Sequence, residues 1–408
     1  MKFLFSLSLK NIIRYKKRTI LTFLILSFGI AFYIWMDSFI DGLNEQSFDN
    51  VINFETSHFK IQSEKYDEDK PFSEDNFMNN YKEVVTALEG TDFIESHTTR
   101  IKFPAELDNS IDSTPCLVIG IDQEQDKKVF ILPEFIEEGS LKPGCAMIGK
   151  KLAASMDVKV GDFIYITFRE AKGMFNSIEM EVTGIVFSPD PGTNNSTVFI
   201  NLSEAKEFLN TEGVTEIAIK TNNRDKYKKY KVALQKSIPD YKIQSWIDMS
   251  QNFLAISKMK KKFSFIFVYF IIIIALVGII NTMLMSVLEK KREIGTMKAL
   301  GFTDGDILKM FIFEGAIIGV LGSIFGIILS IILNWYFVEH GIDMTTMMEG
   351  FGTDNMGYKI IGIAKSTWSI KPMINSIIIC VIASVAASYY PAKQATKLQP
   401  VECLRTIQ

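Results

Sequence analysis

Few side chains in this sequence of 408 residues have the types and the spacings that carry out chemistry. The four cysteines contain no C-x-x-C pair, and neither they nor the three histidines are spaced like zinc ligands or a nucleophile with its base. We therefore expect no catalytic residue, no metal site and no cofactor of its own in this chain. These residues are Cys116, Cys145, Cys380, Cys403, His58, His97 and His340.

Residues 142–151, KPGCAMIGKK, are similar to a phosphate-binding loop of the pattern G-x-x-x-x-G-K-[ST]. Gly144, Gly149 and Lys150 reproduce most of the pattern, but Lys151 occupies the place of the hydroxyl that binds Mg²⁺. We expect a turn followed by a helix at this place. If the chain works with ATP, then ATP and Mg²⁺ bind to another polypeptide.

Residues 289–309, which lie between two apolar runs, form the most informative stretch. A basic cluster at 290–292 is followed by an amphipathic turn, and Gly301 interrupts the pattern. A second short helical pattern begins at the capping residue Thr303. We expect an elbow of two short helices on the cytoplasmic side of a membrane, against which another protein can push.

Four apolar runs have the length of about 18–25 residues that crosses a bilayer. We expect transmembrane helices at 19–40, within 258–288, at 310–338 and at 372–391. The first run resembles a signal peptide, but it lacks a small-x-small cleavage site and follows a long basic leader, which indicates an uncleaved anchor.

Positive charge predicts the orientation, because Lys and Arg are enriched in cytoplasmic segments. Residues 1–18, the elbow and the tail at 392–408 are all basic, so we expect both termini in the cytoplasm. The apolar spacing in residues 1–18 also fits an amphipathic helix on the inner membrane face. Residues 41–257 then form an extracytoplasmic domain, and residues 339–371 form an outer loop.

This orientation has two consequences. Lys258 and the lysines at 260–262 lie on the outer side, against the usual bias, which fits a second helix that projects above the membrane as a stalk. Cys116 and Cys145 are the only cysteines that could share an oxidising compartment, so a disulfide between them remains open.

The extracytoplasmic segment mixes strand-like and helix-like runs, which is typical of an α+β domain. The expected fold is an α-helical membrane protein with four transmembrane helices, one before and three after this domain. The strand-like runs lie at 163–168, 196–201 and 216–220, and the helix-like runs at 77–88, 203–209 and 226–237.

The third apolar run carries a row of glycines, Gly315, Gly319, Gly322 and Gly326. Their spacing places them on one helical face, where they allow close approach of a neighbouring helix. Glu314 precedes this row, and a carboxylate at the membrane edge is costly unless it is paired or near water. A capping or interfacial role and a coupling role with the elbow both remain open.

The apolar runs contain few polar residues, among them Asn281 and Thr282, so a pathway for ions or sugars is not expected. A hydrophobic client, or no transported client, fits better. Because four helices are few for a complete transporter, we expect two permease chains to assemble. Displacement of the elbow would then move the extracytoplasmic domain through the helices.

Four segments of the chain resemble the MacB/FtsX-like superfamily of ABC transporter permeases. They are SVLEKKREIGTMKALGFTDGDILKMFIFEGAIIG, LKNIIRYKKRTILT, YYPAKQATKLQPVECLR and LKPGCAMIGKKLAASMDVKVGDFIYI. Among members of this superfamily, the layout is most similar to the lipoprotein-releasing permeases LolC and LolE.

This resemblance implies a permease that works by mechanotransmission with a separate dimeric ATPase subunit, which binds ATP and Mg²⁺. A second permease, either the same chain or a paralogue, would complete the assembly in the bacterial inner membrane. The elbow would contain the coupling helix that docks on the ATPase. The implied coupling residues are Arg292, Glu293, Ile294, Gly295, Lys298, Ala299, Leu300 and Gly301.

The resemblance also implies extraction of lipoproteins, with acyl chains held between the first and second helices of two permeases and a periplasmic carrier or adaptor as a further partner. Export of a peptide, toxin or drug, FtsX-like signalling to cell-wall hydrolases, and a receptor without an ATPase are the alternatives. The side chains assigned to the acyl-chain cavity are Phe28, Phe32, Trp35, Met36, Phe263, Phe267 and Phe270.

Overall fold

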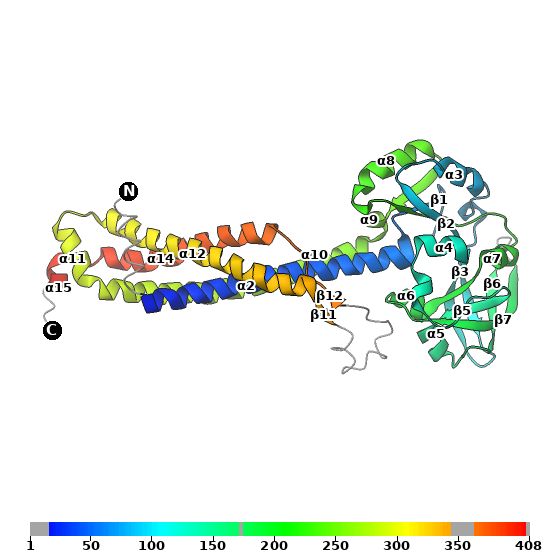
Figure 1. Cartoon of the computed structure of the whole chain (residues 1–408), viewed down its shortest axis with the longest axis horizontal. Coiled ribbons are helices and arrows are strands. Elements are labelled where there is room, and N and C mark those ends of the chain that lie inside the picture. Colours follow the sequence, from blue (N-terminus) through cyan, green and yellow to red (C-terminus); the bar gives the residue numbers. More distant parts are fainter. Residues whose placement is uncertain (1–15, 171–173, 344–362, 405–408) are drawn as a thin grey trace. The chain divides into compact units, whose positions relative to one another are not determined.

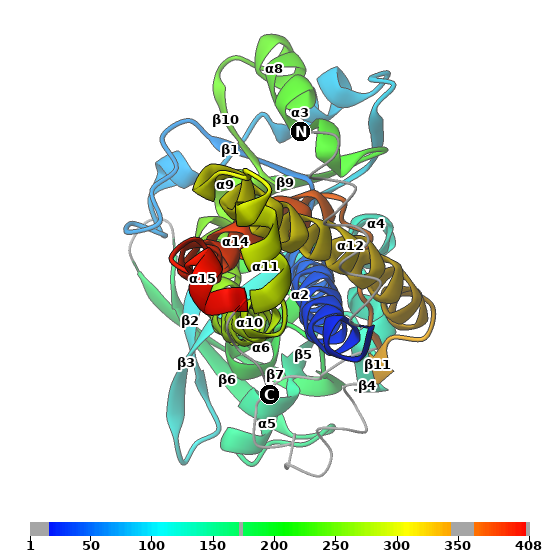
Figure 2. The same cartoon turned by 90° about the vertical axis from the view of Figure 1, so that its left-hand side faces the viewer.

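In the part of the chain that the structure describes, four helices are each long and apolar enough to cross a bilayer. One of them precedes the large mixed domain and three follow it, as the sequence predicted. They run side by side in Figures 1 and 2. The helices are α2 (Lys16–Val51), α10 (Gln251–Glu289), α12 (Asp304–Glu339) and α14 (Lys371–Thr396).

The structure, a computed structural model, describes residues 16–170, 174–343 and 363–404. It divides into a membrane unit and a sheet domain. The membrane unit comprises residues up to Asn44, Ile256–Ile342 and residues from Ile363, and the sheet domain consists mainly of Glu45–Ala255. The amphipathic helix expected over residues 1–18 lies almost entirely outside the described residues.

The prediction of a second short helix in the elbow is wrong. Thr303 is the N-cap, with its side chain and that of Asp306 forming a reciprocal capping box, but the helix that begins at Asp304 is α12 itself. The apolar sequence continues without a break, so the elbow contains one separate helix, α11 (Lys291–Ala299). At the same end of the unit, α14 continues past Pro391 to Thr396 and is followed by α15 (Pro400–Leu404).

The glycine row of α12 faces two neighbouring helices and not one. Gly315 and Gly319 lie against α14, where a Cβ on Gly319 would be 2.7 Å from the Ser384 hydroxyl. Gly322 and Gly326 lie against α2, where a Cβ on Gly326 would be 2.8 Å from Ile30. Because a side chain cannot fit at these contacts, the row brings α12 close to both α14 and α2.

Several polar side chains in the membrane unit pair with each other or with the backbone. Thr22 of α2 and Thr282 of α10 share a hydrogen bond of 2.6 Å, and the Ser27 hydroxyl donates to the Gly322 carbonyl. Lys261 is one of the lysines expected on the outer side against the usual charge bias. Its Nζ lies 2.6 Å from Oδ1 of Asp41 on α2. These pairs offset the cost of placing polar groups in an apolar setting.

The sheet domain is built on a mixed sheet of ten strands in the order β10-β1-β9-β2-β3-β8-β5-β7-β4, with β6 beside β2 and β7. Most neighbours are antiparallel, while β3 and β8, and β5 and β7, run parallel. The strands are β1 (Phe59–Ser63), β2 (Ile94–Asp108), β3 (Ser113–Ile121), β4 (Ile136–Gly139), β5 (Cys145–Gly149), β6 (Phe163–Arg169), β7 (Phe175–Val186), β8 (Thr197–Asn201), β9 (Glu216–Thr221) and β10 (Tyr241–Ser245).

Helices cover this sheet, and its core is a cluster of buried apolar side chains from both the strands and the helices. A separate short ladder joins β11 (Ile342–Asp343) to β12 (Ile363–Ala364). The helices of the sheet domain are α3 (Tyr81–Leu88), α4 (Gln123–Val129), α5 (Lys150–Ser155), α6 (Pro191–Ser196), α7 (Leu202–Leu209), α8 (Tyr227–Ser237) and α9 (Trp246–Met249).

Strands β6, β8 and β9 and helices α7 and α8 lie where the sequence predicted them. Helix α3 starts later than expected, because Met78 pairs with Val214 in an isolated bridge and holds the chain extended before Tyr81. The loop that resembles a phosphate-binding motif is a turn, with φ of +74° at Gly144, between β4 and β5, and α5 follows it. Cys116 and Cys145 are free thiols, so the disulfide that the sequence left undecided is not formed.

Candidate functional site

Helix α11 connects α10 to α12 and is the element around which the candidate site is built. Lys290 separates it from α10 with a turn-like backbone, and the Ile294 amide donates back to the Lys290 carbonyl. The helix ends at Leu300 and Gly301, where a φ of +97° requires glycine. Figures 1 and 2 show α11 beside α15 at the end of the membrane unit.

One face of α11 points into the membrane unit. Ile294 is fully buried in an apolar cluster that includes Val287, Ile307 and Ala395. Gly295 lies against α15, where an added Cβ would be 2.5 Å from the Cβ of Cys403. These two residues, which the resemblance assigned to ATPase docking, therefore hold α11 in place and have no side chain to offer a partner.

The opposite face is available to a partner. Arg292, Ala299, Leu300 and Gly301 are exposed, and Glu293 is half-buried. Leu300 has 75% of its surface exposed, which is high for a large aliphatic side chain. An exposed arginine in the first turn of a helix and an exposed leucine at its C-terminal end are suited to contact with another protein.

The resemblance assigned Lys298 to ATPase docking, but its side chain points toward α12 and α14 of the same chain. Its side chain is 13% exposed, and its Nζ donates to the Thr396 carbonyl at 2.6 Å and lies 2.7 Å from an Asp304 carboxylate oxygen. It therefore contacts the last turn of α14 and the first turn of α12. Its ammonium group is used within this chain.

Lys290 and Glu314 form a buried ion pair at the joint between α10 and α11. The Lys290 Nζ lies 3.1 and 3.3 Å from the two Glu314 oxygens, and the side chains are 1% and 7% exposed. The Phe311 ring centroid is 5.7 Å from the same nitrogen. Glu314 is therefore paired, which resolves how a carboxylate is tolerated at this depth. The partner was not predicted, although both residues belong to the same predicted elbow region.

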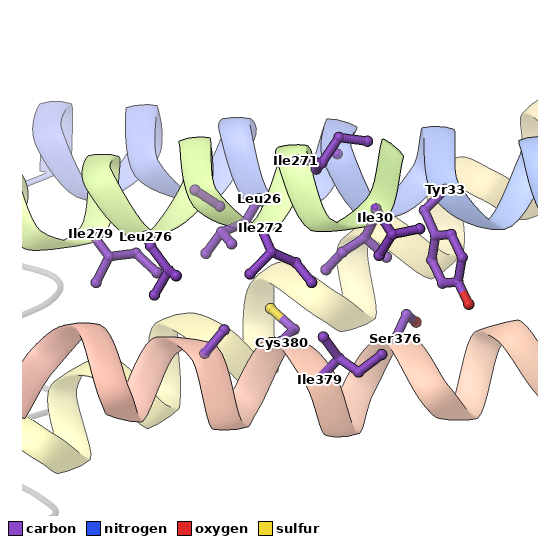
Figure 3. A pocket seen from close by; sticks show the side chains of 14 residues that line it. Leu26, Ile30, Tyr33, Ile271, Ile272, Leu276, Ile279, Ser376, Ile379 and Cys380 are labelled. Carbon is purple, nitrogen blue, oxygen red and sulfur yellow. The ribbon is translucent and has the colours of Figure 1, made fainter. Parts of the chain in front are cut away.

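A small apolar cavity of about 40 Å³ lies between α2, α10 and α14. Figure 3 shows Tyr33 and Ser376 at one end of this cavity and Ile279 and Leu276 at the other. The remaining lining is aliphatic apart from Cys380. The residues that line the cavity are Leu26, Gly29, Ile30, Tyr33, Val268, Ile271, Ile272, Ala275, Leu276, Ile279, Ser376, Ile379, Cys380 and Ala383.

Of the aromatic residues assigned to an acyl-chain cavity, none whose side chain the structure describes lines this space. Phe28 and Phe32 of α2, and Phe263 and Phe270 of α10, point outward and are exposed. Trp35 and Met36, which are adjacent in the sequence, are half-buried. The Trp35 ring packs on the rings of Phe32, Phe39 and Phe337. The side chain of Phe267 is outside what the structure describes. The exposed rings form a surface for lipid or for a second chain.

The sheet domain carries exposed apolar side chains at both ends of the β6–β7 pair, which were not predicted. Met174 and Phe175, at the start of β7, are exposed, and Phe175 shows 79% of its surface. Phe163 on β6 is exposed too. Ile111 lies in the turn after β2, a strand that pairs with β6. The available signal was the pair Met174-Phe175 in a polar turn.

Buried charges stabilise the sheet from within. Arg100 and Asp126 pair through two hydrogen bonds of 2.7 and 2.8 Å. Glu216 lies 3.2 Å from Lys60 and 3.0 Å from Lys102. Burial raises the pKa of Glu216, but the two lysines outweigh burial and lower its pKa to about 2. Burial lowers the pKa of Lys102 to about 8, although Glu216 opposes this.

No group of three or more metal-binding side chains occurs in the part of the chain that the structure describes. The thiol of Cys116 is buried in β3, and burial raises its pKa to about 12, which makes it unreactive. His58 accepts a hydrogen bond from the Thr221 amide and is held neutral because burial lowers its pKa. These residues have structural roles.

Comparison with known proteins agrees with this arrangement. The family model of the MacB-like periplasmic core domain matches residues 19–237, more than half of the chain, and the model of the FtsX-like permease C-terminal region matches residues 265–400. The periplasmic region of MacB from Actinobacillus actinomycetemcomitans aligns with a TM-score of 0.36 at 12% identity, covering 50% of this chain and 95% of that one.

Two similar relatives are membrane proteins of lipoprotein-releasing systems. LolC of Xylella fastidiosa (strain 9a5c) is 24% identical over 310 residues, which are 71% of this chain and 73% of that protein. LolE of Haemophilus influenzae is 23% identical over 346 residues, 80% and 81% of the two chains. The ABC transporter permease YtrF of Bacillus subtilis is 36% identical over 33% of this chain and 30% of its own length. The chain belongs to the MacB/FtsX-like family of ABC transporter permeases.

Proposed function

We propose that this permease couples ATP hydrolysis by a separate ATPase subunit to the extraction and release of lipoproteins from the bacterial inner membrane. The observation that carries the mechanical part is α11, a short helix between two membrane helices with one face buried and the other exposed. A partner that moves the exposed face moves the attached helices with it. The chain itself supplies no catalytic group in this account.

The apolar character of the membrane unit supports a lipid-modified client. Outward-facing phenylalanines on α2 and α10, and the apolar cavity between α2, α10 and α14, offer surfaces for acyl chains. Of the charged pairs, Lys290–Glu314 is buried and Lys261–Asp41 is partly exposed, and the two do not form a row that would conduct ions. The relatives named LolC and LolE support the same class of client.

The distribution of charge supports a cytoplasmic position for α11 and for both termini. Residues 290–292 are basic and lie at the joint and start of α11, and Lys393 and Lys397 lie at the end of α14. Positive charge at these ends favours the cytoplasmic side. The sheet domain then faces the periplasm. The apolar exposed surface of α10 fits a second permease copy, a paralogue or lipid.

The test is to purify the chain in detergent from its native membrane and to identify every retained protein and lipidated peptide by mass spectrometry. Lipoprotein release predicts an ATPase subunit together with acylated lipoproteins. Recovery of an ATPase with an export adaptor or a cell-wall hydrolase, and without lipidated peptides, would contradict the proposed client. Absence of any ATPase would contradict the proposed mechanism.

A second candidate, export of a peptide, toxin or drug through an adaptor, is favoured by the exposed side chains of the β6–β7 region. Phe163 at one end of the β6–β7 pair, and Met174 and Phe175 at the other end, are exposed apolar side chains that suit contact with a protein partner. A lipoprotein carrier would use such a surface equally well. The two candidates therefore differ in the client, and the lipidated peptides in the same purification distinguish them.

A further inference from the structure

Two lysines connect α11 to the helices that follow it in the chain. Lys298 lies on α11 itself and contacts both the Thr396 carbonyl at the end of α14 and Asp304 at the start of α12. Lys290, at the joint between α10 and α11, pairs with Glu314, about three turns into α12. Both ammonium groups are directed into the membrane unit and away from a partner.

The contact of Lys298 with α14 is the stronger of its two contacts. The last carbonyls of a helix have no partner within the helix and carry partial negative charge, so a lysine there both donates a hydrogen bond and neutralises the charge. Asp304 is 70% exposed, and an exposed ion pair contributes little. Lys298 is therefore expected to hold α11 mainly to the end of α14.

The helices α12 and α14 are themselves closely packed. Gly315 lies against Ser388, and Gly319 lies against Ser384 and the Cys380 carbonyl, with no room for a side chain between the helices. Apolar contacts complete the connection, since Ile294 of α11, Ile307 of α12 and Ala395 of α14 share one buried cluster. A force on α11 thus reaches α12 and α14 through direct contacts.

The contacts of α10 with α14 are looser than those with α2, where a Cβ added to Gly29 would be 2.6 Å from Ile271. Much of its apolar surface is exposed, and the cavity shown in Figure 3 separates part of it from α14. A small void beside a helix lets the helix shift without breaking close contacts. Movement of the α11, α12 and α14 group relative to α10 can therefore be accommodated at this cavity.

We propose that Lys298 and Lys290 are positioning residues that transmit the displacement of α11 into α12 and α14, so that these three helices move together relative to α10. This inference rests on the proposed function only in requiring an ATPase that displaces α11. It assigns Lys298 to transmission within the chain and not to contact with the ATPase.

The test uses spin labels on exposed positions of α10 and α12, at Ile274→Cys and Ile328→Cys, with the native cysteines replaced. The full permease is combined with its ATPase subunit, and the distance between labels is measured with and without a non-hydrolysable ATP analogue. The nucleotide should change this distance in the parent protein. Lys298→Met should abolish the change while the ATPase subunit still co-purifies, and Lys298→Arg should restore it.

Matched controls separate transmission from simple stability. Lys309→Met removes an exposed lysine from the same end of α12 and should leave the nucleotide-dependent change intact. The double variant Lys290→Met with Glu314→Leu removes the buried pair without leaving a lone charge, and should reduce the change. ATP-dependent client release per ATP should fall about tenfold in Lys298→Met, the size of a typical coupling energy.

Three results would overturn the inference. The nucleotide-dependent distance change could persist in both Lys298→Met and the double variant, the ATPase subunit could be lost from Lys298→Met, or Lys309→Met could behave like Lys298→Met. The distance measurement needs no client. A distance change in the parent protein without release of any lipoprotein would therefore contradict the proposed client and leave the inference supported.

Discussion

The ion pair of Lys290 and Glu314 is the residue-scale feature with the largest expected effect on stability. Two charged side chains that are almost fully buried are tolerated only because each neutralises the other. Such a pair contributes little compared with two apolar side chains of similar volume, but an isolated member of the pair is very unfavourable. Single replacement should therefore destabilise the chain much more than double replacement.

We predict that Glu314→Leu lowers the free energy of unfolding by about 3–5 kcal/mol, because Lys290 remains buried without a counter-charge. Lys290→Met combined with Glu314→Leu should recover most of this loss. Thermal unfolding of the detergent-solubilised chain measures both. A double variant as unstable as the sum of the two single variants would show that the residues do not act as a pair.

We predict that Glu216 makes the sheet domain sensitive to acid. Its pKa is lowered from 4.5 to about 2 in the folded chain, so its stabilising contribution is complete above pH 4.5 and is lost as the pH falls toward 2. Lys102 stays protonated below its pKa of about 8, so it adds no change in this range. The urea midpoint should therefore fall between about pH 5 and pH 3.

Glu216→Gln provides the comparison for this pH dependence. Because it leaves Lys60 and Lys102 without their carboxylate, this variant should be less stable near neutral pH but should lose less on acidification. Fluorescence of Trp246, in a chain whose other tryptophans are replaced, reports the sheet domain. An equal decrease in the parent and the variant would contradict the role of Glu216.

At the scale of the elements, the close contact between α12 and α14 depends on glycine. A methyl group on Gly315 would overlap Ser388, while one on Gly305, in the first turn of α12, meets only the Thr303 hydroxyl at 3.7 Å. Gly315→Ala should destabilise the chain by about 1–3 kcal/mol. Gly305→Ala should be neutral or stabilising by about 0.4–1 kcal/mol.

Thermal unfolding in detergent measures this pair of variants, and crosslinking between α12 and α14 shows whether the helices have separated. If Gly315→Ala were as stable as Gly305→Ala, the two helices would not be in the close contact that the structure shows.

The elements that the sequence predicted are those defined by long-range periodicity and composition. The four apolar helices, three strands of the sheet and helices α7 and α8 follow from hydropathy and capping patterns that are local in the chain. The predicted start of α3 was wrong because Met78, in the segment expected to begin the helix, pairs with Val214, which is far away in the sequence. The second elbow helix was wrong because a capping residue marks a helix start but not its length.

The side-chain directions within the elbow could not be predicted from the sequence. Lys298 and Arg292 are both basic residues of one short helix, yet one contacts α14 and the other is exposed. The direction of the Lys298 side chain depends on the position of the end of α14. The residue that it contacts there, Thr396, is 98 residues away in the sequence. The pairing of Lys290 with Glu314 and the division of the glycine row between two helices depend on tertiary packing in the same way.

At the scale of the whole molecule, the exposed face of α11 is the surface through which an ATPase subunit would act. Arg292→Glu combined with Leu300→Glu should weaken co-purification of that subunit by about tenfold or more, as expected for central interface residues. Because both side chains are exposed, the thermal stability of the permease should change little. Retention of the ATPase at the parent level would contradict docking at this face.

The central claim is that the chain uses ATP hydrolysis in another subunit to release lipoproteins, and reconstitution tests it most directly. Permease and ATPase subunits are placed in liposomes that contain an acylated lipoprotein, and the amount released to a soluble carrier is measured after ATP is added. We predict ATP-dependent release that requires both subunits and the lipid modification. Release without ATP, or ATP hydrolysis that never releases an acylated client, would contradict the account.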